Sequence, residues 1–191
     1  IRGGRQHVAK ALASSPAVSG RLEYEPMLGL VLGTSGYFGM AGANSDLDLD
    51  VSVLGVSADA RYRRDGIEAR AVAAYFSIGD TEELRTTLDS AGDPLSAVGS
   101  ALFGAYGEVG YNVLQSTDSD QALVPYFRYE FYDTTFGEGD DAFDRASITE
   151  YVMGINYRPI PQVTLKADFI LRRPSEGDGE NSLNLGVGWM F

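Results

Sequence analysis

Apolar and polar residues alternate along most of the chain from residue 18 onward. The clearest example is the segment 181–191, in which one set of alternate positions is apolar and ends in Trp189 and Phe191, while the other set is small or polar. Because successive side chains of a β-strand point to opposite faces, this pattern predicts a strand with one apolar face. Aromatic residues at the end of such a face suit a membrane interface, so the segment predicts the closing strand of an outer-membrane β-barrel.

The same alternation predicts an all-β chain of nine antiparallel strands. The predicted strands cover 18–26, 28–40, 47–63, 67–78, 98–113, 122–134, 148–157, 163–172 and 181–191. In the third strand the apolar parity changes near Leu54 and Gly55, and a change of parity requires an inserted residue, so a β-bulge is expected there. Residues 1–17 are interpreted as an extracellular loop segment; the alternative, a tenth strand hidden in them, is not favoured by their pattern.

The predicted connections alternate in length and charge. One set is short, at 26–27, 64–66 and 158–161, with 114–121 as its longest member. The other set is longer and acidic, at 1–17, 79–96, 133–146 and 173–181, with 41–46 as its shortest member. Outer-membrane barrels have short periplasmic turns and longer extracellular loops. The short set and the C-terminus are therefore expected on the periplasmic side.

Charged residues of both signs lie in the middle of the predicted strands, on the polar parity. The predicted pore-lining residues are Arg21, Arg61, Arg70, Glu108, Arg128, Glu130, Lys166, Asp168 and Arg172. Charges are costly in a packed core but are tolerated in a water-filled lumen. Two interpretations of the basic residues stay open: an electrostatic path for anions, or braces that pair with acidic neighbours across strands.

Aromatic residues recur on the apolar parity of the strands. The predicted membrane-interface aromatics are Tyr24, Tyr62, Tyr111, Tyr151, Tyr157, Trp189 and Phe191. An interface girdle explains them better than ligand stacking, because amphipathic rings favour the headgroup region.

Composition excludes several classes of function. The net charge of −12 argues against nucleic-acid binding, and the absence of Cys excludes disulfides and thiolate metal sites. Carboxylate pairs such as Asp48/Asp50 and Asp140/Asp141 have no accompanying Ser-His arrangement, so no catalytic residues, no enzyme activity and no cofactor are predicted. The single His7 predicts no metal site, whereas calcium binding at the acidic loops 79–96 or 133–146, or bridging of these loops to lipopolysaccharide, remains an alternative. No signal peptide or long apolar run is visible.

Several stretches resemble the phosphate-selective porin family, the O and P type porins of Gram-negative bacteria. They are GRLEYEP (20–26), GAYGEVGY (104–111), LVPYFRYE (123–130), GINYRPIPQVTLKADF (154–169) and LNLGVGWMF (183–191). The resemblance covers about residues 18–191 and corresponds to the C-terminal half of such a porin. It implies a sixteen-stranded transmembrane barrel, often a homotrimer, that passes small solutes. The mixed charge of the predicted lumen departs from the cationic lining of the selective members.

The sequence therefore predicts an outer-membrane porin, a passive diffusion channel for small hydrophilic solutes, with anions such as phosphate among the candidates. The first alternative is a non-conducting structural barrel that anchors or binds partners through its acidic extracellular loops. The second is a closed, soluble β-barrel that binds a small ligand.

Overall fold

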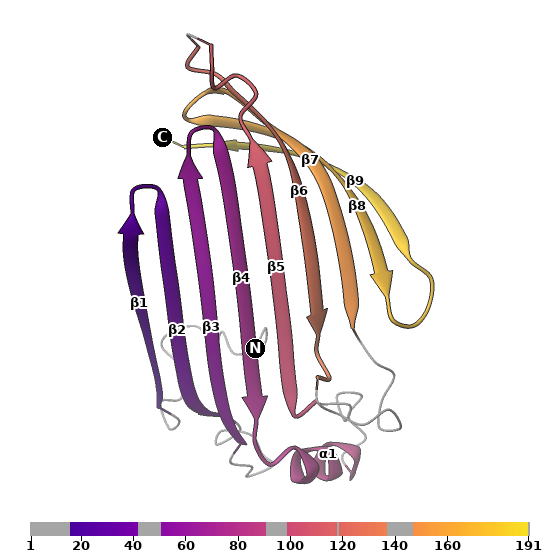
Figure 1. Cartoon of the computed structure of the whole chain (residues 1–191). Helices are drawn as coiled ribbons and strands as arrows, with labels where there is room; N and C mark the ends of the chain where they lie inside the picture. Colours follow the sequence, from indigo (N-terminus) through magenta and orange to yellow (C-terminus); the bar gives the residue numbers. More distant parts are fainter. Residues whose placement is uncertain (1–15, 42–50, 91–98, 118, 137–146, 191) are drawn as a thin grey trace.

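The computed structural model describes residues 16–41, 51–90, 99–117, 119–136 and 147–190. In this part of the chain nine antiparallel strands form one sheet in sequence order (Figure 1). They are β1 (Ala17–Met27), β2 (Leu30–Ala41), β3 (Val51–Arg64), β4 (Ile67–Ile78), β5 (Ala101–Tyr111), β6 (Ala122–Asp133), β7 (Ile148–Ile160), β8 (Val163–Pro174) and β9 (Glu180–Trp189). The prediction of an all-β, nine-stranded antiparallel chain is confirmed for these residues.

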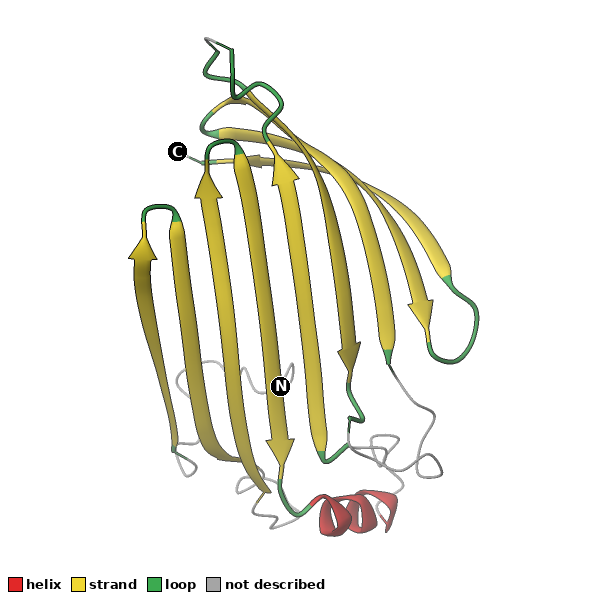
Figure 2. Ribbon diagram, in the orientation of Figure 1, coloured by secondary structure: helices red, strands yellow, loops and turns green. Residues whose placement is uncertain are grey.

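The two ends of the strands carry different connections (Figure 2). The turns β1–β2, β3–β4 and β7–β8 have two residues each, and with 112–121 between β5 and β6 they define the short-turn edge. The opposite, wide-loop edge carries the helix α1 (Thr81–Ser90) below β4. The predicted assignment of the connections to two opposite edges is confirmed, but their lengths do not alternate throughout, because the β8–β9 connection 175–179 is shorter than 112–121. The prediction of a loop throughout 79–96 is wrong for residues 81–90. Of the predicted loop segment 1–17, residues 1–15 lie outside the described residues, and Ala17 begins β1.

Two of the predicted short turns lie slightly further along the chain. The first is formed by Leu28 and Gly29, and Gly29 has a φ of 86°, a left-handed conformation that glycine adopts without steric cost. Pro26 is therefore the penultimate residue of the edge strand β1, next to a register shift. The third turn uses residues 161–162 rather than 158–161. The Asp65-Gly66 turn is confirmed, with φ values of 52° and 82°.

The predicted β-bulge in β3 is wrong. β3 pairs with β2 without a register shift from Val51 to Tyr62, and with β4 from Val53 to Arg64. Leu54 therefore shares a face with Val56, and Val51 and Val53 lie on the other face at the end of the strand. The change of parity in the sequence marks a local apolar patch on the second face, not an inserted residue.

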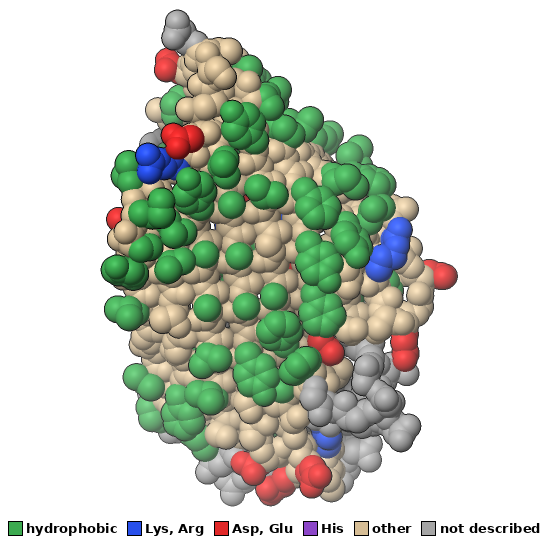
Figure 3. Space-filling view, in the orientation of Figure 1, with side chains coloured by type: hydrophobic (Ala, Val, Ile, Leu, Met, Phe, Trp, Pro, Cys, Tyr) green, Lys and Arg blue, Asp and Glu red, His purple; other side chains and the backbone are tan. Residues whose placement is uncertain are grey.

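The sheet is curved, and its two faces differ in chemistry. β7, β8 and β9 bend away behind the front of the sheet in Figure 1, so that the face turned toward the viewer is convex. Hydrophobic side chains are spread over this convex face (Figure 3). On β9 they include Leu183, Leu185, Val187 and Trp189, which are 66–78% exposed. The large apolar residues therefore lie mainly at the surface, and not in a core of the described chain.

Few apolar side chains are buried within the described part. They are Val51, Ala101, Val124, Tyr126 and Val152. No helix in the described part of the chain combines the length and the apolar character that crossing a bilayer requires.

Candidate functional site on the concave face

The strand register places all nine predicted pore-lining residues on the concave face. Directly opposed residues of neighbouring strands share a face, and Arg61, Arg70, Glu108 and Arg128 are opposed in turn from β3 to β6. The row that contains Glu130 continues through Glu150 to Arg172. Lys166 and Asp168 follow on the same side of β8. Their grouping on one face was predicted from parity alone.

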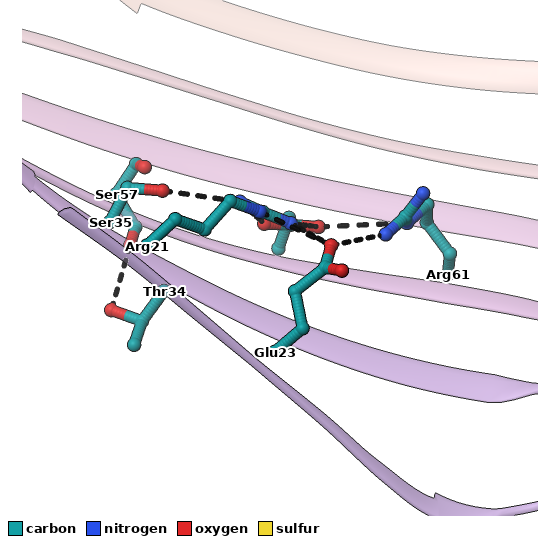
Figure 4. A network of polar contacts seen from close by, with 7 residues as sticks. Arg21, Glu23, Thr34, Ser35, Ser57 and Arg61 are labelled. Atoms are coloured by element: carbon teal, nitrogen blue, oxygen red, sulfur yellow. Dashed lines mark hydrogen bonds and ion pairs between the residues drawn. The ribbon is translucent and has the colours of Figure 1, made fainter.

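The first cluster joins β1 to β3 (Figure 4). The guanidinium of Arg21 donates to both carboxylate oxygens of Asp59, at 2.7 and 3.0 Å, and to Oε1 of Glu23 at 2.8 Å. It also donates to the hydroxyl of Ser35 at 3.1 Å. Nη2 of Arg61 donates to Oε1 of Glu23 at 2.6 Å. Two basic and two acidic groups thus neutralise one another.

Glycine at position 33 makes this cluster possible. Gly33 lies in β2 between Glu23 of β1 and Asp59 of β3. A Cβ atom at this position would collide with the guanidinium of Arg21 and the carboxylate of Asp59. The missing side chain lets Arg21 cross β2 and reach a strand that is not its direct neighbour.

The second cluster spans β4, β5 and β6 around Glu108. Its Oε1 lies 3.0 Å from Nε of Arg70 in an ion pair, and its Oε2 accepts from Nη2 and Nε of Arg128 at 2.8 and 3.0 Å. Arg128 also lies 3.6 Å from the carboxylate of Glu130 and 4.9 Å from the ring centroid of Tyr106. The short, doubly donated contact to Arg128 is of the charge-assisted kind, which is stronger than a neutral hydrogen bond.

The third cluster occupies β6, β7 and β8. Nζ of Lys166 lies 3.3 Å from Asp168 and 5.3 Å from the ring centroid of Tyr126. Arg172 lies 3.5 Å from Glu150 and donates to the hydroxyl of Tyr132 at 2.8 Å. We call these three clusters together the charged belt; it runs from Arg21 on β1 to Arg172 on β8.

A separate ion pair near the short-turn edge connects strands that are far apart. Arg158 of β7 donates to both carboxylate oxygens of Glu68 on β4, across the two intervening strands. Arg63 of β3 approaches the same carboxylate at 3.3 Å. Three strand intervals span about 14 Å along a flat sheet, and the curvature of the concave face shortens the gap that these side chains bridge. Strand parity puts Arg158 and Glu68 on the same face as the predicted pore-lining residues, but it does not predict that they meet.

Three basic residues near the short-turn edge, Arg61, Arg63 and Arg70, are paired and yet remain open to solvent. Arg61, Arg63, Arg70 and Arg158, with Glu25 and Glu68, line a hollow of about 500 Å³. The Arg63 and Arg70 side chains are 73% and 52% exposed. Arg61 and Arg70 are directly opposed, an arrangement that is unfavourable for like charges. The bracing contacts are therefore present, and these cations also face the open side of the sheet.

Charge on the concave face is nearly balanced. Its described strands present eight basic and nine acidic side chains. All other residues of the chain provide seven basic and eighteen acidic side chains, so they carry almost all of the net charge of −12. The concave face itself is thus close to neutral.

The predicted interface aromatics lie on the convex face, as far as the structure describes them. Five are placed toward the short-turn edge: Tyr24, Tyr62, Tyr111, Tyr157 and Trp189. Tyr151 lies nearer the other edge, with its ring 5.5 Å from that of Tyr129. Phe191 lies outside the described residues.

A second group of aromatics near the wide-loop edge was not predicted. The ring of Phe103 lies 5.5 Å from that of Phe136 and 6.2 Å from that of Phe131, and Tyr75 meets Phe136 edge-on at 6.3 Å. Phe103 and Phe131 follow the apolar parity of their strands, so strand position could have identified them. Phe136 lies beyond the end of β6, where no parity signal exists.

No group of three or more metal-ligating side chains occurs in the described part of the chain. His7, Asp48, Asp50, Asp140 and Asp141 lie outside the described residues, as do parts of both acidic loops that were considered for calcium. The expectations about metals, cofactors and catalysis therefore stay predictions from the sequence.

Comparison with known protein families finds no family model that matches this chain. Among curated proteins, the chain is similar to an uncharacterized protein of Aquifex aeolicus (strain VF5), with 27% identity over 192 residues. The alignment covers 98% of this chain and 44% of that relative. The chain thus spans less than half the length of the relative, whose description names no activity.

Proposed function

We propose that this chain is part of the wall of an outer-membrane porin, a channel for passive diffusion of small hydrophilic solutes. The observation that carries the proposal is the contrast between the faces of one curved sheet. The convex face exposes apolar side chains over all of its strands, whereas the concave face carries the charged belt. A lipid-facing exterior and a water-filled interior need this distribution.

The dimensions of the strands support a membrane span. The described strands have 10 to 14 residues, and a tilted strand needs about 9–11 residues to cross the hydrocarbon layer. Aromatic side chains occur toward both ends of the convex face, as expected of residues at two membrane interfaces. Tyr24 and Trp189 belong to one end and Tyr75 to the other.

Hydration of the concave face argues against the soluble barrel. Guanidinium and ammonium groups such as those of Arg70 and Lys166 are 52% and 38% exposed. In a dry interior, ion pairs lose several kcal/mol of hydration energy per charge. A lumen filled with water removes this cost and leaves the ion pairs as braces of the wall.

The complete protein is proposed to be larger than the described sheet. Closed antiparallel barrels of bacterial outer membranes have an even number of strands, and nine are described here. The porin-like motifs and the 44% coverage of the Aquifex relative support a role as the C-terminal part of a longer barrel, of sixteen strands in a homotrimer. The part of the segment 1–17 that precedes β1 would then belong to an extracellular loop.

The test uses the protein of the complete reading frame, folded into a planar lipid bilayer. An open pore with a size-limited conductance is the expected result. A folded protein that never conducts would refute the channel. A monomer that stays in solution without detergent, and that shows no heat-modifiable migration, would refute the membrane assignment itself.

Selectivity can be tested on the basic residues of the belt. If Arg70, Arg128 and Lys166 line an anion path, their joint replacement by Gln shifts the reversal potential toward cation preference. An unchanged reversal potential in a conducting variant would identify them as braces only.

A non-conducting structural barrel is the second candidate. The observation that favours it is the concentration of acidic charge in residues other than those of the concave face. Such residues could bind divalent cations, lipopolysaccharide or basic partners. A folded but silent protein that retains such a partner would support this candidate over the porin.

A further inference from the structure

The concave face has a second hollow beside the charged belt, toward the wide-loop edge. It has a volume of about 380 Å³ and lies over β1 to β4. Two adjacent cross-strand rows form it. One row runs Ser19, Tyr37, Gly55, Phe76, and the other runs Arg21, Ser35, Ser57, Ala74. Three hydroxyl-bearing serines and two aromatic rings thus meet above a floor of small residues.

The two rings of this hollow have exposed surface. Tyr37 and Phe76 are 39% and 38% exposed, although they lie on the concave face and not on the apolar convex face. A Cβ atom at Gly55 would collide with the ring of Phe76, so glycine lets this ring lie over β3. The hollow therefore presents aromatic surface within a hydroxyl-lined wall.

The charges beside the hollow are already neutralised. Among the described residues that line it, Arg21 alone is charged, and its guanidinium donates to Asp59, Glu23 and Ser35. A bound anion would have to displace these carboxylates. Serine hydroxyls, in contrast, both donate and accept hydrogen bonds, so the hollow suits a neutral solute that also carries hydroxyl groups.

We propose that this hollow is a binding subsite for a neutral sugar or polyol that passes along the wall, an inference that rests on the proposed channel function. The electron-rich faces of Tyr37 and Phe76 would contact the C–H face of a pyranose ring. The hydroxyls of Ser19, Ser35 and Ser57 would exchange hydrogen bonds with its hydroxyl groups. The volume lies within the range of about 300–1,000 Å³ typical of small-molecule sites.

The experiment measures how maltotriose, added as the probe, reduces the ion current through the open channel. Saturable reduction is expected. Phe76→Leu keeps the apolar bulk but removes the ring face, and should raise the half-blocking concentration about ten-fold, as should Tyr37→Leu. The matched control is Phe38→Leu, the same change on the convex face of β2, which should leave the block unchanged.

The outcomes separate the two proposals. A conducting channel that maltotriose does not block, or equal block in Phe76→Leu and the unmodified protein, overturns the subsite and leaves the channel intact. If the protein does not conduct, the channel fails. Saturation-transfer NMR with maltotriose on the detergent-solubilised protein then decides the subsite: signals that Phe76→Leu abolishes support it, and their absence from the unmodified protein overturns it.

Discussion

Glu108 is the carboxylate on which the middle of the charged belt depends. Its Oε1 lies 3.0 Å from Nε of Arg70, and its Oε2 accepts hydrogen bonds from Nη2 and Nε of Arg128 at 2.8 and 3.0 Å. Its side chain is only 9% exposed. The substitution Glu108→Gln preserves the size of the side chain and removes its charge, which leaves two guanidinium groups without their shared counter-charge.

The expected loss of stability follows from the exposure of the two arginines. Removal of one partner from a fully buried ion pair costs about 3–5 kcal/mol. Arg70 is half exposed and regains water, so its share is below about 1 kcal/mol. Arg128 is 26% exposed and keeps the longer contact to Glu130, at 3.6 Å, and its place over the ring of Tyr106. We expect a loss of about 2 kcal/mol in the free energy of unfolding, within the range for hydrogen bonds to charged groups.

Urea-induced unfolding in detergent micelles measures this loss. Trp189, the only tryptophan of the chain, provides the fluorescence signal. Glu23→Gln is the matched control, because it makes the same change of charge at a side chain that is 47% exposed, and it should cost less than about 1 kcal/mol. Equal losses for the two variants would refute the argument that burial of Glu108 sets its contribution.

Two further predictions concern packing and the two faces. Gly154→Ala should lower the free energy of unfolding by about 1–3 kcal/mol, because the new Cβ would lie 2.6 Å from the ring of Tyr126. This loss should be smaller when Tyr126→Leu is also present. An unchanged loss in the double variant would contradict the contact. Leu185→Arg, on the convex face of β9, should cost about 2–4 kcal/mol at the bilayer midplane. Asn184→Arg, on the concave face, should be tolerated. After folding into vesicles, heat-modifiable migration should therefore weaken for Leu185→Arg and not for Asn184→Arg. An equal response of the two variants would refute the assignment of the faces.

Strand order, strand number and the assignment of residues to faces were accessible from the sequence. Period-two alternation determines which residues share a face, so the grouping of Arg21 with Glu108 and Arg172 needed no tertiary information. The same rule failed in β3, because an apolar residue at the end of a strand can lie on either face. The parity of Val51 and Val53 predicts an inserted residue, whereas in the structure these residues lie on the concave face at the end of an unbulged strand.

The helix α1 and the particular ion-pair partners within the charged belt could not be predicted from period-two alternation. Thr81–Ser90 contains acidic residues in its first turn, a favourable helix start, but its few apolar residues gave a weak helical period. Contacts between non-adjacent strands depend on curvature and on glycines that let a side chain cross a strand. Gly33 has this role for Arg21, and a local pattern cannot reveal it.

The bridge between Arg158 and Glu68 has a mechanical consequence. It joins β4 to β7 across the concave face, as a chord joins two points of an arc. Flattening the sheet would move these two strands apart and pull the two side chains out of contact. The bend of this part of the sheet is therefore held partly by charge, and not by backbone pairing alone. High salt, which screens ion pairs, would weaken this contact without breaking any backbone hydrogen bond between strands. The same nine strands would then relax toward a flatter sheet while their register stays intact.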